Sequence, residues 1–324
     1  MFAGLTQSDF ACYEPRKWKS NVYNRERLEV RQKLLALGQS CAGHLLGPDG
    51  APLFLEASVE HPAVWNHKQV DSQSIFFSRN EAARKQLDGF IDRQKPISSL
   101  LDDPTPQRNH LFLGVTVLHE SLDVVLKIHP DASVDRQNLE RKLDEHYEAE
   151  RLLGLLHELP EGFTIGVLPD QSALSADFSI EQLAEIMSAL PPQSGAAGGM
   201  LIPGQPVHMF AIGTSQPAAQ FVAMSTDEQA AWVTAQLTLL LPIYRFIVWT
   251  RDNDFVSMAK VLDKEKTVRR QRGFQKGDRV RIVRGMLAGK DGAVAEVDAK
   301  GLLKIIVGKM VIKIDASDVE RANA

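Results

Sequence analysis

A short β pattern near the carboxyl end constrains this chain of 324 residues more than any other feature. Arg279–Ile282 alternates arginine with valine and isoleucine, which is the two-residue period of a strand with one solvated face and one apolar face. An apolar pattern of the same kind resumes at Val294 and Val297. The segment therefore predicts two strands joined by a turn, within a small β unit at about residues 273–321.

The turn between these strands is rich in glycine. Glycine tolerates positive φ angles and a close approach of other backbone, and both are common in tight turns of small β domains. We therefore expect the glycines to fix the shape of the turn. The candidate positions in the turn are Gly285, Gly289 and Gly292, and Gly277, also part of the motif, opens the segment before the first strand.

The stretch Gly285–Gly292 is similar to the KOW motif, which is shared by NusG and Spt-type transcription elongation factors and by several ribosomal proteins. The apolar runs Leu302–Val307 and Met310–Ile314, followed by Ser317–Glu320, fit the remainder of that domain. The resemblance implies a small all-β SH3-like barrel at 273–324. NusG also begins with an α/β domain that carries a Trp-Tyr pair in its first strand, and Trp18 lies in no such pattern.

In the KOW family, the glycine turn and the neighbouring loops contact RNA or another protein. The resemblance therefore implies a binding role for several cations and for an apolar pair in the turn, although Leu287 could instead fill the interior of the barrel. A basic segment before the barrel adds three arginines. The candidate residues are Arg269, Arg270, Arg272, Lys276, Arg279, Arg281, Arg284, Met286, Leu287, Lys290 and Lys304.

The charge of the chain is distributed unevenly. The net charge is −4, but residues 260–324 contain 16 Lys and Arg against 9 Asp and Glu, which gives +7 there and −11 for residues 1–259. A basic module on an acidic body favours a polyanion or an acidic protein surface as partner. We expect an α+β body at 1–253 with a possible break near 191–200, and a basic connecting helix at 254–272.

Composition excludes several classes of protein. Hydrophobic residues make up 44% and charged residues 24% of the chain, as in ordinary globular domains. Cys12 and Cys41 are too few for a disulfide framework or a zinc cluster. The chain starts with neither a basic segment nor a long apolar core, so no signal peptide is expected. No apolar run reaches the length of a membrane span. We therefore expect a bacterial-type cytoplasmic protein without a membrane partner; its oligomeric state stays open.

The body combines helix and strand signals. Two runs rich in Val, Leu and Ile, 110–118 and 122–129, are separated by a short polar turn and predict an antiparallel hairpin. Further strands are expected at 52–59, 74–78, 163–167, 207–212 and 220–223. Helices are expected within 9–50 and at 80–93, 134–156, 180–190 and 226–251, the last one kinked at Pro242. This mixture predicts an α+β fold with an antiparallel sheet. Residues 5–145 also resemble the uncharacterised YktB-like family, which implies the same class of fold and no known activity.

Motifs for catalysis are weak. No metal-ligand spacing, phosphate-binding loop or dinucleotide fingerprint is present, so the sequence predicts no cofactor or metal. His119, Asp123 and Lys127 are the alternative catalytic residues. Asp102 and Asp103 followed by Asp123 and Lys127 are reminiscent of the two acids and a lysine of metal-dependent nucleases. Histidines at strand ends are, however, more often structural.

Three classes of function remain open. The leading expectation is a non-enzymatic factor that binds RNA polymerase or the ribosome, in a NusG-like antitermination, elongation or ribosome-associated role. The second is a nucleic-acid-acting enzyme, such as a nuclease, that uses the KOW barrel for targeting. The third is a protein-interaction module without nucleic-acid contact.

Overall fold

The computed structural model describes residues 2–91, 106–190, 208–263, 273–297 and 302–322. The chain divides into two compact units, Met1–Val256 and Ser257–Ala324. We refer to them as the body and the carboxyl-terminal unit. Each is described by itself.

A seven-stranded sheet forms the centre of the body. All neighbouring strands are antiparallel, and their order is β1-β2-β3-β4-β7-β5-β6. The hairpin predicted at 110–118 and 122–129 is confirmed as β3 and β4, which pair over six residues on each side of a short turn. The strands are β1 (Phe54–Ala57), β2 (Gln73–Ser78), β3 (Phe112–Val117), β4 (Ser121–Ile128), β5 (Phe163–Val167), β6 (Asp170–Ala173) and β7 (Phe210–Pro217).

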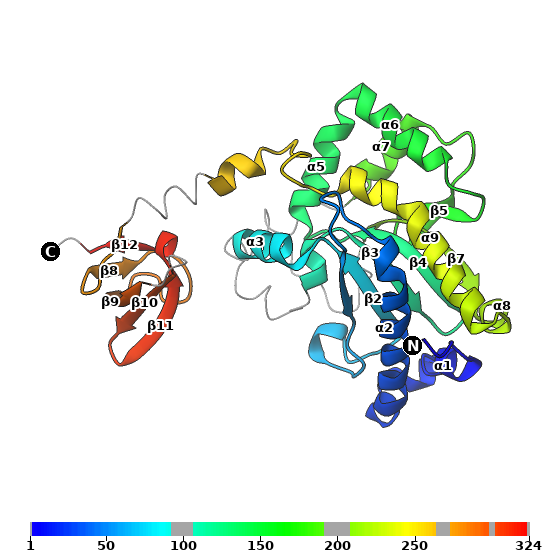
Figure 1. Cartoon of the computed structure of the whole chain (residues 1–324), viewed down its shortest axis with the longest axis horizontal. Coiled ribbons are helices and arrows are strands. Elements are labelled where there is room, and N and C mark those ends of the chain that lie inside the picture. The colour runs from blue at the N-terminus through cyan, green and yellow to red at the C-terminus, as the bar shows by residue number, and fades with distance from the viewer. Residues whose placement is uncertain (1, 92–105, 191–207, 264–272, 298–301, 323–324) are drawn as a thin grey trace. The chain divides into compact units, whose positions relative to one another are not determined.

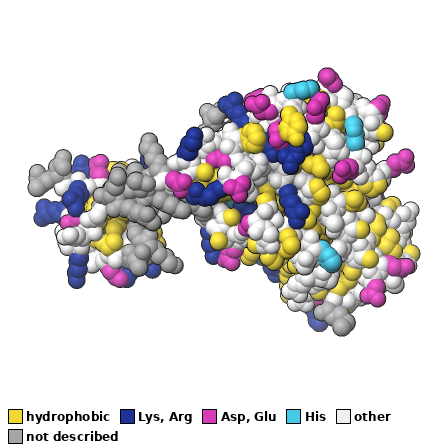
Figure 2. All heavy atoms as spheres, turned by 45° about the horizontal axis from the view of Figure 1, so that its top comes forward, with side chains coloured by type: hydrophobic (Ala, Val, Ile, Leu, Met, Phe, Trp, Pro, Cys, Tyr) yellow, Lys and Arg dark blue, Asp and Glu magenta, His cyan; other side chains and the backbone are white. Residues whose placement is uncertain are grey.

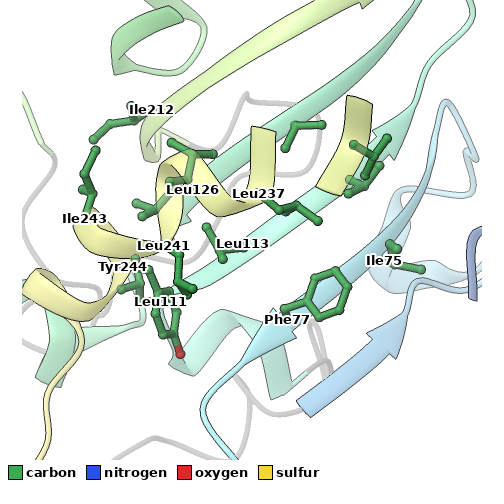
Figure 3. Close-up of a cluster of buried hydrophobic side chains, with 14 of the residues drawn as sticks. Ile75, Phe77, Leu111, Leu113, Leu126, Ile212, Leu237, Leu241, Ile243 and Tyr244 are labelled. Carbon is green, nitrogen blue, oxygen red and sulfur yellow. The ribbon is translucent and has the colours of Figure 1, made fainter. Parts of the chain in front are cut away.

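Two long helices, α2 (Asn24–Cys41) and α9 (Thr226–Ile247), pack side by side on one face of this sheet (Figure 1). The main core lies between them and the strands. Figure 3 shows α9 side chains such as Leu237 and Leu241 clustered with Leu113 and Leu126 of the central hairpin. All of these leucines are at most 4% exposed. Burial of apolar side chains on this face, which we call the core face, drives the helices onto the sheet.

Helix α3 (Glu81–Ile91) lies on the opposite face, at the end of the sheet formed by β1 to β3. Leu55 and Ile75 face Gly38 of α2, so their neighbours Phe54 and Glu56 must point away from the core face. Arg84 of α3 forms an ion pair with Glu56 and stacks over the ring of Phe54, 4.2 Å from its centroid. The sheet therefore has helices on both faces.

The remaining helices of the body are short. Helices α5 and α6 follow β4 and pack against α9, and α6 also contacts α7. Near the amino terminus, α1 contacts α8. Their bounds are α1 (Gln7–Ala11), α5 (Ser133–Leu143), α6 (His146–His157), α7 (Ile180–Ser188) and α8 (Ala218–Ala223).

Helix α9 is long and apolar enough to cross a membrane by length and composition alone. In this structure it is the central helix of the core face, and its apolar residues from Val233 to Ile247 are largely buried against the sheet. Packing within the body thus accounts for the apolar composition of α9. The helix also continues through Pro242 as one element.

Two sequence predictions for the body are wrong. The segment 220–223 was expected to be a strand, but it belongs to α8, which begins just after Pro217. Periodicity cannot separate a short apolar run in a helix from one in a strand. A single helix was expected at 134–156, but it is broken, because Glu145 is extended between α5 and α6 (φ −94°, ψ 113°). Strand β6 was not anticipated.

The carboxyl-terminal unit contains a five-stranded antiparallel sheet of order β11-β10-β9-β8-β12. The predicted connecting helix at 254–272 is wrong at its start, because 254–257 are not helical; residues 258–263 are helical, and 264–272 lie outside the described residues. The last strand returns to pair with the first strand of the unit. The strands are β8 (Arg279–Ile282), β9 (Asp291–Val297), β10 (Leu302–Val307), β11 (Met310–Asp315) and β12 (Val319–Arg321).

One face of this small sheet covers a core of its own. Val280, Ile282, Val294 and Ile305 are at most 2% exposed, and Phe274 packs with them. Within the described residues, no hydrogen-bonded pair joins the edge strands β11 and β12, so no closed barrel is found. The predicted α+β class, with several helices and antiparallel sheets, is confirmed. The carboxyl-terminal segment is shown as a five-stranded sheet.

Candidate functional site

The glycines of the β8–β9 turn have two separate structural roles. Gly285 and Gly289 have φ values of +90° and +84°, and Gly277 before β8 has +95°; this region of backbone conformation disfavours other residues. At Gly292, a Cβ atom would lie 2.6 Å from Ile305 Cγ2 and 2.7 Å from the Ile306 carbonyl oxygen. The expectation of positive φ or close approach is confirmed at Gly285, Gly289 and Gly292.

Backbone hydrogen bonds hold the turn in one conformation. The Gly289 N–H donates to the Ile282 carbonyl at 2.7 Å, and the Ile282 N–H donates to the Lys290 carbonyl at 2.9 Å. Within the turn, the Ala288 N–H donates to Gly285 at 3.1 Å. The residues between Ile282 and Lys290 are therefore presented on a fixed loop.

The two apolar side chains of this turn, Met286 and Leu287, have different environments: one lies in solvent and the other against the core. Met286 is 82% exposed, one of the highest values for an apolar residue in the described chain. Leu287 is half-buried and packs against the core of the carboxyl-terminal unit. Its packing fits the structural alternative, in which Leu287 fills the interior, while Met286 stays available for a partner.

The predicted cations fall into two groups. Arg281 forms a two-pronged ion pair with Asp291, with Nε–Oδ1 at 2.8 Å and Nη2–Oδ2 at 3.2 Å. These hydrogen bonds raise the pKa of Arg281 and lower the pKa of the Asp291 carboxyl. Lys304 pairs with Glu296. These two cations are thus already neutralised by neighbouring strands.

The second group has no such partner. The side chains without a hydrogen bond or an ion pair to any carboxylate of the described chain are Lys276, Arg279, Arg284 and Lys290. All four are exposed. Lys and Arg side chains stand out on the visible face of the carboxyl-terminal unit in Figure 2. Arg269, Arg270 and Arg272 lie outside the described residues.

A second turn lies at the same end of the small sheet. Because β8 to β11 run up and down in succession, the β8–β9 and β10–β11 turns share one end. Met310, which follows the β10–β11 turn, is 54% exposed, and Lys309 beside it is exposed. Sequence reading did not select these two residues. Their signal was the Gly308-Lys309-Met310 turn, in which Gly308 has a φ of +60°.

The alternative catalytic residues of the body do not form a connected group. Asp123 and Lys127 share the face of β4 opposite to the core face, as their spacing requires. Asp123 accepts hydrogen bonds from Ser121 Oγ at 2.8 Å and Ser215 Oγ at 2.7 Å. His119 lies in the β3–β4 turn, and within the described residues no hydrogen bond or ion pair joins it to either residue. Asp102 and Asp103 lie outside the described residues.

A buried polar relay in the body was missed by sequence reading. The fully buried Asp135 at the start of α5 pairs with Arg79, which follows β2. Asp135 also accepts hydrogen bonds from the backbone N–H groups of Leu111 and Trp249, both at 2.8 Å. Arg79 continues the relay to the buried His110. Four segments that are distant in sequence therefore meet at one carboxylate.

The relay fixes the tautomer of His110. The Arg79 guanidinium donates to His110 Nδ1 at 3.3 Å, so Nε2 carries the hydrogen and donates to Asp88 of α3 at 3.0 Å. Burial lowers the pKa of His110, and the positive charge of Arg79 acts in the same direction, although Asp88 opposes both. The lowered pKa favours the neutral form of His110 in the folded body, and its ring links two charged groups.

This arrangement predicts a pH dependence of stability. Because the folded pKa of His110 lies below its ordinary value of about 6.5, the unfolded chain takes up the proton first as pH falls. We expect the free energy of unfolding to be highest above pH 6.5 and to fall between pH 6.5 and pH 5. His110→Gln should flatten this slope in urea titrations followed by tryptophan fluorescence. His146→Gln, at an 80% exposed site on α6, should leave the slope unchanged, and an equal slope in both variants would contradict the assignment.

A separate recess of about 620 Å³ lies beside the β5–β6 hairpin and α7. It contains two carboxylates, those of Asp170 and Glu185, and one imidazole among apolar groups, amides and a hydroxyl. These groups suit many classes of small molecule, so the recess alone assigns no ligand. Its lining includes Ile165, Val167, Phe178, Gln182, Glu185 and His208.

Comparisons with known proteins assign no family to the chain. Within the described residues, no group of three or more His, Cys, Asp and Glu side chains could hold a metal ion. The function is therefore inferred from the geometry of the described residues. No protein-family model matches the sequence, and neither does any curated protein.

Proposed function

We propose that this protein is a docking factor, and that its carboxyl-terminal unit binds a transcription or translation ribonucleoprotein through the end of the small sheet that carries the β8–β9 turn. The observation that supports this proposal is the exposure of Met286 on a turn fixed by glycines, beside Arg284 and Lys290, which have no ion pair within the described chain. We call these three residues and the adjacent Lys309 and Met310 the docking end.

The docking end combines apolar and cationic side chains, which is the chemistry of a specific contact with an acidic surface. An exposed methionine gains free energy when a partner removes it from water, and its flexible side chain adapts to different partner shapes. Unpaired arginine and lysine can each contact a phosphate or a carboxylate without first breaking an internal ion pair. Arg281 lacks that advantage because Asp291 already holds it.

Ribonucleoproteins present both kinds of acidic surface, phosphate and acidic protein. Phe274 is the only aromatic residue of the carboxyl-terminal unit, and it is 8% exposed. Stacking on unpaired bases is therefore not supported, because it requires exposed aromatic rings. The docking end suits the RNA backbone or a protein subunit of the particle.

The finer fold of the carboxyl-terminal unit belongs to the same proposal. We infer that the five strands form an SH3-like domain of the KOW type, since the strand order returns β12 to β8 and since Gly285 and Gly289 of the motif lie in the β8–β9 turn. The role that follows is NusG-like antitermination or elongation, or association with the ribosome, in the cytoplasm. The body then supplies a second contact or a regulatory function.

The test is binding of the full-length chain to bacterial RNA polymerase, ribosomes and a structured RNA, at salt concentrations from about 50 to about 200 mM. We expect binding to at least one of them. If phosphates are contacted, affinity should fall with salt, and each lost phosphate contact should reduce the logarithmic slope by about 0.7 to 0.9. The double variant Arg284→Glu/Met286→Ala should weaken binding at least about tenfold, because it removes one cation and the exposed apolar anchor.

A matched control is Arg25→Glu, which reverses a charge at a 90% exposed site of the body. It should leave binding unchanged. Absence of binding to all three targets at the lowest salt concentration would end the proposal. Capture of a protein target without salt dependence would favour a pure protein-interaction module. Cleavage of the RNA, lost in Asp123→Asn, would favour the nuclease alternative.

A further inference from the structure

The face of the large sheet opposite to the core face carries polar and small residues at its centre. The residues of β4 on this face are Asp123, Val125 and Lys127, and β4 is the fourth of the seven strands. In an antiparallel sheet, the face away from the core commonly carries polar residues that alternate with the buried apolar ones. Lys127 is unusual on this face, because its neighbours across the strands, Phe112 and Ala211, are buried and apolar.

Strand register defines the neighbours of Lys127. Directly across from it lie Phe112 on β3 and Ala211 on β7, and the next residue in the same row is Gly166 on β5. Phe112 is 6% and Ala211 0% exposed, so the carbon stem of Lys127 runs between two buried apolar neighbours. Ala211 and Gly166 add almost no side-chain volume on the β7 side.

A second row, four residues away along β4, is polar. Ser74 on β2 and Thr116 on β3 share a hydrogen bond at 2.9 Å, and Thr116 lies directly across from Asp123. Asp123 lies across from Ser215 of β7, whose hydroxyl donates to it. Hydroxyl and carboxylate groups thus form a continuous line over four strands, about 13 Å along β4 from the Cα atom of Lys127.

The amino group of Lys127 has no hydrogen bond or ion pair within the described residues, although part of the side chain is accessible. Desolvation lowers its pKa, and the distant carboxylates of Asp123 and Asp71 only partly oppose this effect. An ammonium group with no partner at such a site costs free energy. Its neutral form, by contrast, is a nucleophile.

We propose that Lys127 is the reactive amine of a small-molecule site on this face, and that it takes a small hydroxylated carbonyl compound as an imine. The Nζ lone pair attacks the carbonyl carbon and forms a C–N bond, and the nitrogen gives up a proton as the carbonyl oxygen becomes a hydroxyl. That hydroxyl then leaves as water with the second proton of the nitrogen, and the nitrogen lone pair forms the C=N bond. The hydroxyl groups of the compound would then lie toward the row of Asp123, Ser215 and Thr116.

The experiment uses the full-length chain, glyceraldehyde as the carbonyl compound and cyanoborohydride to reduce any imine to a stable amine. Labelling of each lysine is followed by peptide mass spectrometry at several pH values. The internal reference is Lys313, an exposed lysine of β11 without an ion pair in the described chain. At pH 7 we expect Lys127 to be labelled at least about tenfold faster than Lys313, because each unit by which the pKa falls raises the neutral fraction about tenfold.

Two further measurements make the outcome decisive. The preference for Lys127 should disappear when the chain is unfolded in urea, since it depends on the folded surroundings. Lys127→Met should lose the label and keep or raise the urea midpoint of the body, because an apolar side chain replaces an unpaired amine. Labelling of Lys127 at or below the rate of Lys313 in the folded chain would overturn the proposal. So would a loss of the folded body in Lys127→Met, which would assign the lysine a structural role.

Discussion

Replacing Asp135 with alanine is expected to destabilise the body by about 3–5 kcal/mol, the range typical of breaking a buried ion pair by removal of one partner. The carboxylate is fully buried and is the anionic partner of Arg79, itself only 6% exposed. Its loss would also leave the N–H groups of Leu111 and Trp249 without their acceptor. A buried backbone donor without an acceptor adds about 1–3 kcal/mol in comparable cases.

The measurement is urea unfolding followed by tryptophan fluorescence, because all four tryptophans of the chain lie in the body. Asp144→Ala is the matched control. Asp144 lies at the end of the same helix, is 70% exposed and is 3.6 Å from Arg141. Its replacement should change the free energy of unfolding by less than about 1 kcal/mol, as for other surface pairs. A cost of under about 1 kcal/mol for Asp135→Ala would refute the relay.

A double replacement distinguishes the effect of the Arg79–Asp135 ion pair from the effect of the hydrogen bonds that Asp135 accepts from the backbone. In Arg79→Met/Asp135→Leu, both charges leave together and apolar groups of similar size take their place. Much of the lost stability should return, because no buried charge is left uncompensated. If the double variant is as unstable as Asp135→Ala, then the backbone hydrogen bonds of Asp135, and not its charge, hold the four segments together.

The relay also shows why the sequence predicts the strands and helices of the body more easily than the polar groups buried in its core. The β3–β4 hairpin is local, and its two apolar runs reveal it directly. Helix α5 buries Asp135, Arg136, Asn138 and Lys142, a polar face that a periodicity argument assigns to solvent. For Asp135, what makes that burial possible is a set of partners that lie just after β2, just before β3 and just after α9. One sequence without an alignment carries no signal for contacts over such separations.

The carboxyl-terminal unit shows the opposite case. Its glycine pattern is local. Each glycine lies where the backbone needs a positive φ or a close approach, and glycine is the residue type that indicates such a need. What the pattern could not indicate is which cations of the unit remain unpaired. Arg281 and Arg284 look alike in sequence, but the register of β8 and β9 places Asp291 directly across from Arg281 alone. The docking end therefore depends on strand pairing that no short motif encodes.

Gly292 provides the second test, since its replacement is expected to disrupt the small sheet. A Cβ atom there would lie within 2.7 Å of the Ile306 carbonyl oxygen, which is backbone and cannot move without disturbing the pairing of β9 with β10. Overpacking of this kind costs about 1–3 kcal/mol. Gly292→Asn should cost more than Gly292→Ala, because the larger side chain meets the same obstacle.

Gly289 is the matched control, because it is constrained by φ and not by space. Its φ is +84°, and no atom lies within 4 Å of the point that an added Cβ would occupy. Asparagine tolerates this conformation better than alanine does, so Gly289→Asn should cost less than Gly289→Ala, the reverse of the order at Gly292. Amide hydrogen exchange of β9 and β10 in the full-length chain measures both series, since the carboxyl-terminal unit has no tryptophan or tyrosine. If Ala and Asn rank in the same order of cost at both positions, the two roles assigned to these glycines are wrong. If the orders differ, binding by Gly292→Asn is measured next. Loss of docking in this variant, with unchanged unfolding of the body by tryptophan fluorescence, would locate binding in the small sheet.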